Sequence, residues 1–272
     1  MTTLLQISDA HFGTEQPPVV QALLQLAHAD VPDLVVMSGD ITQRARRHQF
    51  AAARAFIEQL KPAALLTIPG NHDIPLFNLA LRAFAPYANY SRAFGENLEP
   101  VFESPHLLVI GVNTTRPQRH KDGELSAQQI ERVTQQLQRA AASQLRIIVV
   151  HQPVLAIRKS DEDNLLDGYR QAVPAWAAAG GDIIMGGHIH LPYVRSMRTT
   201  FGALPRDLWT VQAGTAVSSR LREGITNSVN VIRCNGDQSP RRCVVERWDY
   251  VPTLSRFEQH SNQELTFAAT VG

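Results

Sequence analysis

Short apolar runs alternate with helical patterns along the first 190 residues. Six runs have the length and composition of buried strands: Leu4–Ile7, Leu34–Met37, Leu65–Ile68, Leu107–Val112, Leu145–Val150 and Ile183–Met185. Helical spacing of apolar residues lies between them, in Val19–Ala29, the stripe Phe50, Ala53, Ile57 and Leu60, the segment from Ser126 to about Ala142, and Tyr169–Ala179. Strands that alternate with helices predict an α/β fold that contains parallel strand pairs.

After about residue 191 the pattern becomes strand-rich and loses its long helices. The predicted strands there are Tyr193–Met197, Leu208–Gln212, Ser228–Arg233 and Val244–Trp248. They form either a second sheet packed on the first or a small appended domain. No Pro/Ser/Gly-rich linker precedes them, which favours a single domain over residues 1–272. The polar tail after about residue 251 is expected to fray or to lie on the surface.

Polar clusters follow five of the six early strands directly. They read Ser8-Asp9-Ala10-His11, Ser38-Gly39-Asp40, Pro69-Gly70-Asn71-His72-Asp73, His151-Gln152-Pro153 and Gly186-Gly187-His188-Ile189-His190. In open α/β sheets, ligands bind outside the carboxyl ends of the strands. We therefore expect these side chains to meet at one edge of the sheet.

The residue types in these clusters are typical of a metal site. In an extended chain, residues two apart point to the same side, so Asp9 with His11, and His188 with His190, can reach one ion together. Imidazole and oxygen ligands in mixture suit Mn, Fe or Zn better than Ca. Each motif alone has an ordinary explanation as a turn or a buried pair. Seven candidate ligands together exceed what one tetrahedral ion needs, and they suit two ions if one carboxylate bridges.

Composition excludes several other classes of protein. The chain has 272 residues, with 26 Lys and Arg against 25 Asp and Glu, and this near-neutral balance makes a nucleic-acid partner unexpected. Two cysteines exclude a disulfide framework and a four-sulfur zinc site. Cys234 and Cys243 flank a turn and can face each other across a hairpin, where we expect free thiols. The start of the chain lacks a basic region, and no apolar run reaches about 18 residues, so a cytoplasmic protein without membrane contact is expected.

The five blocks together resemble the pattern of the calcineurin-like metallophosphoesterases: Asp-x-His, Gly-Asp, Gly-Asn-His-Asp, His and Gly-His-x-His. Their intervals, and the stretch Gly123-Glu124-Leu125-Ser126, are similar to the class III cyclic-nucleotide phosphodiesterase branch. The resemblance implies two packed mixed β-sheets flanked by helices, in four layers α/β/β/α. The segment Ile41-Thr42-Gln43-Arg44-Ala45 departs from the Thr-Asp-x-Gly ending common in that branch, which weakens the case for cyclic AMP as substrate.

The resemblance also implies a role for each residue of the five blocks. Two ions, commonly Mn, Fe or Zn, are expected. The first would be held by Asp9, His11, Asp40 and His190, and the second by Asp40, Asn71, His151 and His188. His72 would be the catalytic histidine above the metals. Asp73 would orient or charge-stabilise His72, or it would only shape the turn.

The function expected from these residues is hydrolysis of a small phosphodiester, such as a cyclic nucleotide or a glycerophosphodiester. Hydroxide activated by the two ions would attack phosphorus, and His72 would give a proton to the leaving group or stabilise the developing charge. The alternatives are a phosphomonoesterase, a lipid pyrophosphatase or a nuclease on the same scaffold. A non-catalytic interaction module is a further alternative, against which the complete ligand set counts. Arg44, His120 and Arg220 are candidate substrate contacts, and the sequence specifies no oligomeric state.

Overall fold

The computed structural model describes residues 1–202, 204–222, 224–235 and 242–267. Six strands form the first sheet: β1 (Thr2–Ile7), β2 (Leu34–Ser38), β3 (Leu65–Ile68), β10 (Ser228–Asn235), β11 (Arg242–Val251) and β12 (Arg256–Thr266). Six form the second: β4 (Val101–Ser104), β5 (Leu107–Gly111), β6 (Leu145–Val149), β7 (Ile183–Gly186), β8 (Tyr193–Ser196) and β9 (Trp209–Gln212). Their orders are β12-β11-β10-β1-β2-β3 and β4-β5-β6-β7-β9-β8.

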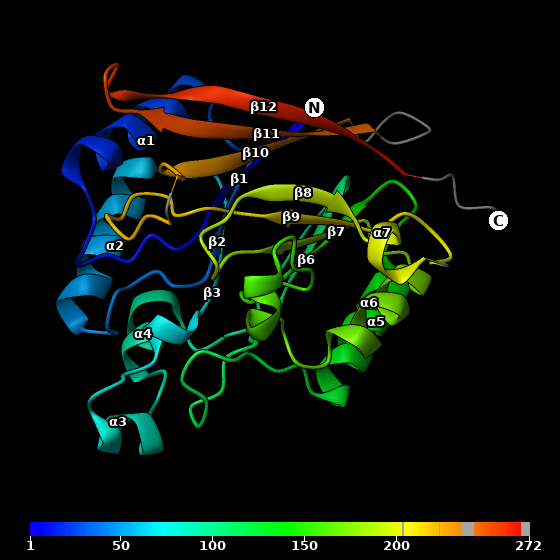
Figure 1. The fold of residues 1–272 in the computed structure, drawn as a ribbon, viewed down its shortest axis with the longest axis horizontal. Helices are drawn as coiled ribbons and strands as arrows, with labels where there is room; N and C mark the ends of the chain where they lie inside the picture. Colours follow the sequence, from blue (N-terminus) through cyan, green and yellow to red (C-terminus); the bar gives the residue numbers. More distant parts are fainter. Residues whose placement is uncertain (203, 223, 236–241, 268–272) are drawn as a thin grey trace.

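Helices cover the outer face of each sheet (Figure 1). The α-helices are α1 (Pro17–Ala29), α2 (Arg47–Leu60), α3 (Leu79–Phe84), α4 (Ala88–Phe94), α5 (Ala127–Arg139), α6 (Tyr169–Ala178) and α7 (Arg198–Phe201). Two 3₁₀-helices, η1 (Asn71–Asp73) and η2 (Lys159–Asn164), lie in loops. The two mixed sheets flanked by helices confirm the predicted fold class.

The early strands are apolar on both faces because each face packs against another layer. In β1, Leu4 belongs to the apolar core between the sheets, whereas Leu5 and Ile7 pack with the residues of α1 and α2. On the other side of the molecule, Ile148 of β6 packs with α5 and α6 around the fully buried Trp176. This burial on both sides explains the continuous apolar runs seen in the sequence.

The parallel pairing that positions the candidate site is present in both sheets. β1, β2 and β3 run parallel, and so do β5, β6, β7 and β9. The carboxyl ends of parallel neighbours lie at the same edge, so the loops that follow them are neighbours in space.

The strands after residue 191 complete both sheets, and they form neither a sheet of their own nor an appended domain. β8 and β9 join the second sheet, while β10 pairs antiparallel with β1 in the first. On β10 and β11, Cys234 and Cys243 are cross-strand neighbours with free thiols.

Of the two arrangements expected for the tail after about residue 251, fraying is wrong for the residues that the structure describes, whereas a position at the surface agrees with the mostly exposed edge strand β12. β12 pairs antiparallel with β11. Val251 lies opposite Arg256 at one end of the pairing, and Arg242 lies opposite Thr266 at the other end. The sequence of β12 looks polar because an edge strand buries only a few side chains, here Phe257 and Leu265. Residues 268–272 of the same expected tail lie outside the described part of the chain.

Within the described ranges, no helix combines the length and hydropathy that crossing a bilayer requires.

Candidate metal centre

The predicted ligands come together from the ends of five strands. Asp9 and His11 follow β1, Asp40 follows β2 and Asn71 follows β3, whereas the remaining histidines follow β6 and β7 of the second sheet. Among the described residues, three groups have ligand atoms within 4.8 Å of one another: Asp9, His11 and His190; His11, Asp40 and His72; and Asp40, His151 and His188. The candidate centre therefore lies where the carboxyl edges of the two sheets meet.

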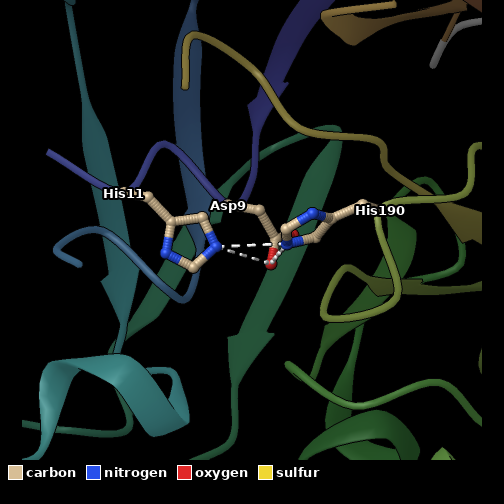
Figure 2. A group of neighbouring side chains, drawn as sticks. All are labelled: Asp9, His11 and His190. Carbon is tan, nitrogen blue, oxygen red and sulfur yellow. Dashed lines mark hydrogen bonds and ion pairs between the residues drawn. The ribbon is translucent and has the colours of Figure 1, made fainter. Parts of the chain in front are cut away.

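The first group joins the loop after β1 to the loop after β7 (Figure 2). The Nε2 atoms of His11 and His190 lie 3.1 Å apart. Asp9 Oδ1 is 3.3 Å from Nε2 of His190 and 3.9 Å from Nε2 of His11. Two imidazole nitrogens and one carboxylate oxygen thus converge on a common point.

Asp40 lies between the first group and the third. Its Oδ1 atom is 3.3 Å from Nε2 of His151, and its Oδ2 atom is 3.8 Å from Nε2 of His11. The side chain is almost completely buried, and each oxygen faces a different histidine. This arrangement allows one carboxylate to serve two neighbouring ions.

Five of the predicted ligands have a left-handed backbone conformation, which residues other than glycine rarely adopt. The φ angles are 51° for Asp9, 44° for His11, 49° for Asp40, 72° for His188 and 54° for His190. Asp9 and His11 therefore approach each other through tight turns, and not through the extended chain that their spacing suggested. Strain of this kind is concentrated at functional sites, where the surrounding structure maintains it.

Two glycines allow the loops to approach this closely. A Cβ atom on Gly187 would overlap the Ser8 hydroxyl and the Asp9 carboxylate, and one on Gly39 would overlap the His151 ring. Gly39 also has a φ angle of 95°, so a side chain there would be strained in any case.

Carbonyl groups orient two of the histidines. Nδ1 of His151 donates a hydrogen bond to the Ser38 carbonyl at 2.9 Å, and Nδ1 of His190 donates one to the Arg220 carbonyl at 2.7 Å. Each bond places the proton on Nδ1 and leaves Nε2, the atom that faces the carboxylates, available as a ligand. This is the usual outer arrangement of a metal-binding histidine.

Burial and neighbouring charges shift the pKa values of the ionisable groups of the site strongly. Burial would raise the pKa of Asp9, but the neighbouring His190 lowers it to about 2. Burial lowers the pKa of His11 to about 3, and burial together with His151 lowers that of His188 to about 3. Burial opposes the charged form of His151 as well, but the Asp40 carboxylate raises its pKa to about 9. The site thus contains ionised carboxylates next to imidazoles that are held in different protonation states.

Unsatisfied polar atoms indicate that the site fits metal ions. Among the described residues, buried atoms without a hydrogen-bond partner include Nδ1 of His11, Oδ1 of Asn71 and Nδ1 of His188. A buried polar atom without a partner costs about 1–3 kcal/mol, so such atoms are rare unless something else binds them. Imidazole, carboxylate and amide oxygen together form a suitable donor set for Mn, Fe or Zn.

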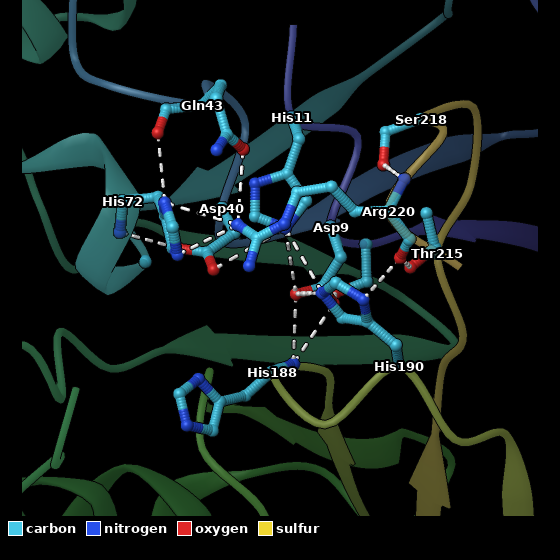
Figure 3. Close-up of polar contacts among 12 residues, drawn as sticks. Asp9, His11, Asp40, Gln43, His72, His188, His190, Thr215, Ser218 and Arg220 are labelled. Atoms are coloured by element: carbon cyan, nitrogen blue, oxygen red, sulfur yellow. Dashed lines mark hydrogen bonds and ion pairs between the residues drawn. The ribbon is translucent and has the colours of Figure 1, made fainter. Parts of the chain in front are cut away.

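His72 lies beside this centre and contacts Gln43 and Arg220 (Figure 3). Its Nδ1 atom donates to the Gln43 carbonyl at 2.9 Å, and the Arg220 guanidinium lies 3.0 Å from its Nε2 atom. Its backbone N–H donates to Oδ1 of Asp40 at 2.8 Å. His72 is thus held by its backbone and by one ring nitrogen, and its second ring nitrogen faces a cation.

Asp73 makes its hydrogen bonds to the backbone and not to the His72 ring. Its carboxylate accepts from the N–H groups of Ile41 at 3.0 Å, Thr42 at 2.8 Å and Gly70 at 2.9 Å. Burial and the nearby Asp40 raise its pKa to about 7. These contacts match the turn-shaping alternative, because they join the loop after β2 to the loop after β3.

The three candidate substrate contacts also lie next to the centre. Arg44 and His120 line a small pocket that Asn71 and His72 line as well, and the Arg220 guanidinium contacts the His72 ring. Gln43, which the sequence did not single out, bonds both His72 and the Arg220 guanidinium. A glutamine in a loop carries no ligand-type pattern, so only the fold reveals this contact.

Comparison with known proteins agrees with this geometry. The family model for the calcineurin-like phosphoesterases matches residues 2–192, and the chain therefore belongs to this family. It is a metal-dependent phosphoester hydrolase. A Synechococcus protein named as a probable cyclic nucleotide phosphodiesterase is 25% identical over 214 residues, which cover 75% of this chain and 79% of that protein.

Solved structures share the fold at low sequence identity. The purple acid phosphatase PPD1 of yellow lupin has a TM-score of 0.71 and 13% identity, and the match covers 97% of this chain but only 53% of the lupin chain. This chain thus spans about half the length of the lupin enzyme. A dimetal phosphatase from Danio rerio has a TM-score of 0.70 and 13% identity, with 98% and 99% of the two chains covered.

Proposed function

We propose that this protein is a dinuclear metal-dependent phosphodiesterase that hydrolyses a small phosphodiester. The position of Asp40 carries the proposal, because its two oxygens face histidines of two neighbouring groups. The name of the Synechococcus relative supports action on a diester. A cytoplasmic location stays a prediction, which cell fractionation tests.

We assign the ligands as two overlapping sets. Asp9, His11, Asp40 and His190 would hold one ion, and Asp40, Asn71, His151 and His188 would hold the other. When bound, two such ions would supply Lewis-acid polarisation of the phosphoryl oxygens and a lowered pKa for water near neutral pH. The carbonyls of Ser38 and Arg220 bind Nδ1 of His151 and His190, so that Nε2 of each ring faces the carboxylates and would be available to an ion.

We assign His72 the transfer of a proton to the leaving oxygen. Its Nδ1 proton is bound to the Gln43 carbonyl, so exchange takes place at Nε2. The Arg220 guanidinium lies next to this atom, where it places a fixed positive charge for the phosphoryl oxygens. Asp73 has a structural part, since its carboxylate holds the turn that presents His72.

Metal analysis and a pair of chromogenic esters test the proposal. The purified protein is supplied with Mn, Fe or Zn, and bound metal is measured together with hydrolysis of bis-p-nitrophenyl phosphate and p-nitrophenyl phosphate. We expect about two ions per chain and faster hydrolysis of the diester. A preference for the monoester would favour a phosphomonoesterase, and a protein without metal or activity would be an interaction module.

A further inference from the structure

A groove of about 380 Å³ opens beside the candidate metal centre. One side is formed by residues 44–48 at the start of α2, and the other by Pro75–Asn78 and Leu81. Arg44 and Leu76 line this groove and also the small pocket that contains Asn71 and His72. The groove is therefore continuous with the place where a phosphate would bind.

Phe77 lies in this groove as an exposed aromatic ring. Its side chain is 76% exposed, and it belongs to none of the three apolar core clusters found among the described residues. The guanidinium carbon of Arg44 lies 5.2 Å from the centre of the ring, a cation–π distance. A phenylalanine in this position adds little to the core, but with Arg44 it offers a flat surface for a second planar group.

The charge of the groove favours a ligand with a phosphate. Arg44, Arg46 and Arg47 line it, and none of the described residues that line it is acidic. The whole chain has a formal net charge of only +1, so this is a local concentration of positive charge. An aromatic ring next to arginines is the combination that binds a base and its phosphate in nucleotide-binding proteins.

We propose that Phe77, together with Arg44, is a specificity-determining subsite for a planar aromatic ester group, such as a nucleobase, of the phosphodiester. The proposal rests on the proposed function for the position of the phosphate. His72 and Phe77 are five residues apart, so the chain between them spans at most about 18 Å. Arg44 and Leu76 line both the pocket at His72 and the groove at Phe77, which joins the two positions. An aliphatic ester group, such as glycerol, would leave the ring uncovered and would gain nothing from it.

Calorimetric binding of two phosphates that differ only in the base tests this subsite. Adenosine 5′-monophosphate and ribose 5-phosphate are titrated into the Mn-loaded protein and into Phe77→Ala. Stacking of a base on an aromatic side chain predicts about tenfold tighter binding of the adenosine compound to the wild-type protein. Phe77→Ala should lose this preference and should bind ribose 5-phosphate as before.

Phe84→Ala is the matched control, because Phe84 is 90% exposed on α3 but does not line the groove. This variant should keep the preference for the base. Equal affinity of the wild-type protein for both ligands, or an unchanged preference in Phe77→Ala, would overturn the subsite. Hydrolysis of bis-p-nitrophenyl phosphate is measured in parallel: its absence from the wild-type protein would refute the proposed function, whereas the base preference tests the subsite alone.

Discussion

Arg220 contacts two histidines of the candidate metal centre with two different groups. Its backbone carbonyl accepts a hydrogen bond from His190, and its guanidinium lies beside Nε2 of His72. The guanidinium also donates to the Gln43 side chain at 3.1 Å. A substitution of the side chain therefore separates the two roles, because the carbonyl remains.

We expect Arg220→Met to lower kcat for bis-p-nitrophenyl phosphate about 10- to 100-fold with little change in bound metal. A hydrogen bond to a charged group contributes about 1.5–3 kcal/mol, and about 1.4 kcal/mol corresponds to a factor of ten. Steady-state kinetics and metal analysis measure the two quantities. Arg195→Met on β8 serves as the control, and wild-type kcat in Arg220→Met would exclude the assigned role.

The roles assigned to Asp40 and His72 predict different amounts of bound metal in the two alanine variants. Asp40→Ala should remove bound metal and activity together, because its carboxylate faces both groups of ligands. His72→Ala should lower kcat but keep much of the metal, since His72 is assigned to proton transfer. Metal analysis beside the kinetic assay distinguishes them. Full activity in His72→Ala, or full metal in Asp40→Ala, would contradict the assignment.

Among the elements, the loop between β7 and β8 depends on residues far away in the sequence. The Arg222 guanidinium donates to the Ile189 carbonyl at 3.0 Å, between the two histidines of that loop. The same guanidinium pairs with the buried Asp161 of η2, at 3.0 and 3.1 Å from its two oxygens. η2 thus supports the loop through one arginine, although it provides no predicted ligand.

We expect Asp161→Asn to weaken metal binding about tenfold, because outer supports of metal ligands typically change affinity by about 10–100-fold. Competition with a chromogenic chelator measures the metal affinity. Asp163→Asn is the matched control, since Asp163 lies on the same 3₁₀-helix and is exposed. An equal affinity in both variants would show that the Asp161–Arg222 pair does not support the loop.

β12 provides a second prediction at this scale, since its sequence alone suggested a frayed tail. Leu265 is completely buried between the sheets, opposite Cys243 of β11. Leu265→Ala should lower the free energy of unfolding by about 2–5 kcal/mol, as for other buried leucines. Asn262→Ala, at an exposed position of the same strand, should change it little. Urea denaturation compares the two, and equal stabilities would restore the view of a frayed tail.

For the whole molecule, the histidines of the centre connect stability to pH. The pKa values of His11 and His188 are lowered to about 3 in the folded protein, against an ordinary value of 6.5. Below about pH 6.5 the unfolded chain therefore binds protons that the folded chain does not, and stability falls. Asp73, with its pKa raised to about 7, acts in the opposite direction and offsets about one of these two protons.

After treatment with a chelator, the protein should consequently become less stable as the pH falls from about 6 to 4.5, by on the order of 1 kcal/mol per pH unit. His151, with its pKa raised to about 9, is protonated in both states over this range and contributes no slope. Urea denaturation at several pH values measures the effect. A stability that is constant or that rises toward pH 4.5 would contradict the arrangement of charges at the site.

The early strands, and the gathering of the polar residues that follow them, could be predicted from the chain alone. The apolar run Leu65–Ile68 has the bounds of β3, and the helical segment that begins at Ser126 is α5, where the Ser126 side chain accepts from the Gln129 N–H at 3.1 Å. Both depend on local signals, namely apolar periodicity and capping residues, that need no partner elsewhere. Phe77 and Gln43 gave no such signal, because their importance depends on neighbours that only the fold provides.

By itself, the sequence determined that polar residues follow buried parallel strands, and therefore that a metal-binding edge exists in an α/β protein. Only the tertiary structure decided how the residues of that edge meet. The left-handed turns at Asp9 and His11, the support of His188 and His190 by Arg222, and the inclusion of β12 in the first sheet all depend on contacts between distant segments. The periodicity of apolar residues shows which face of a helix or strand is buried. Packing of the whole chain decides which element covers that face and which turn conformations the connecting loops adopt.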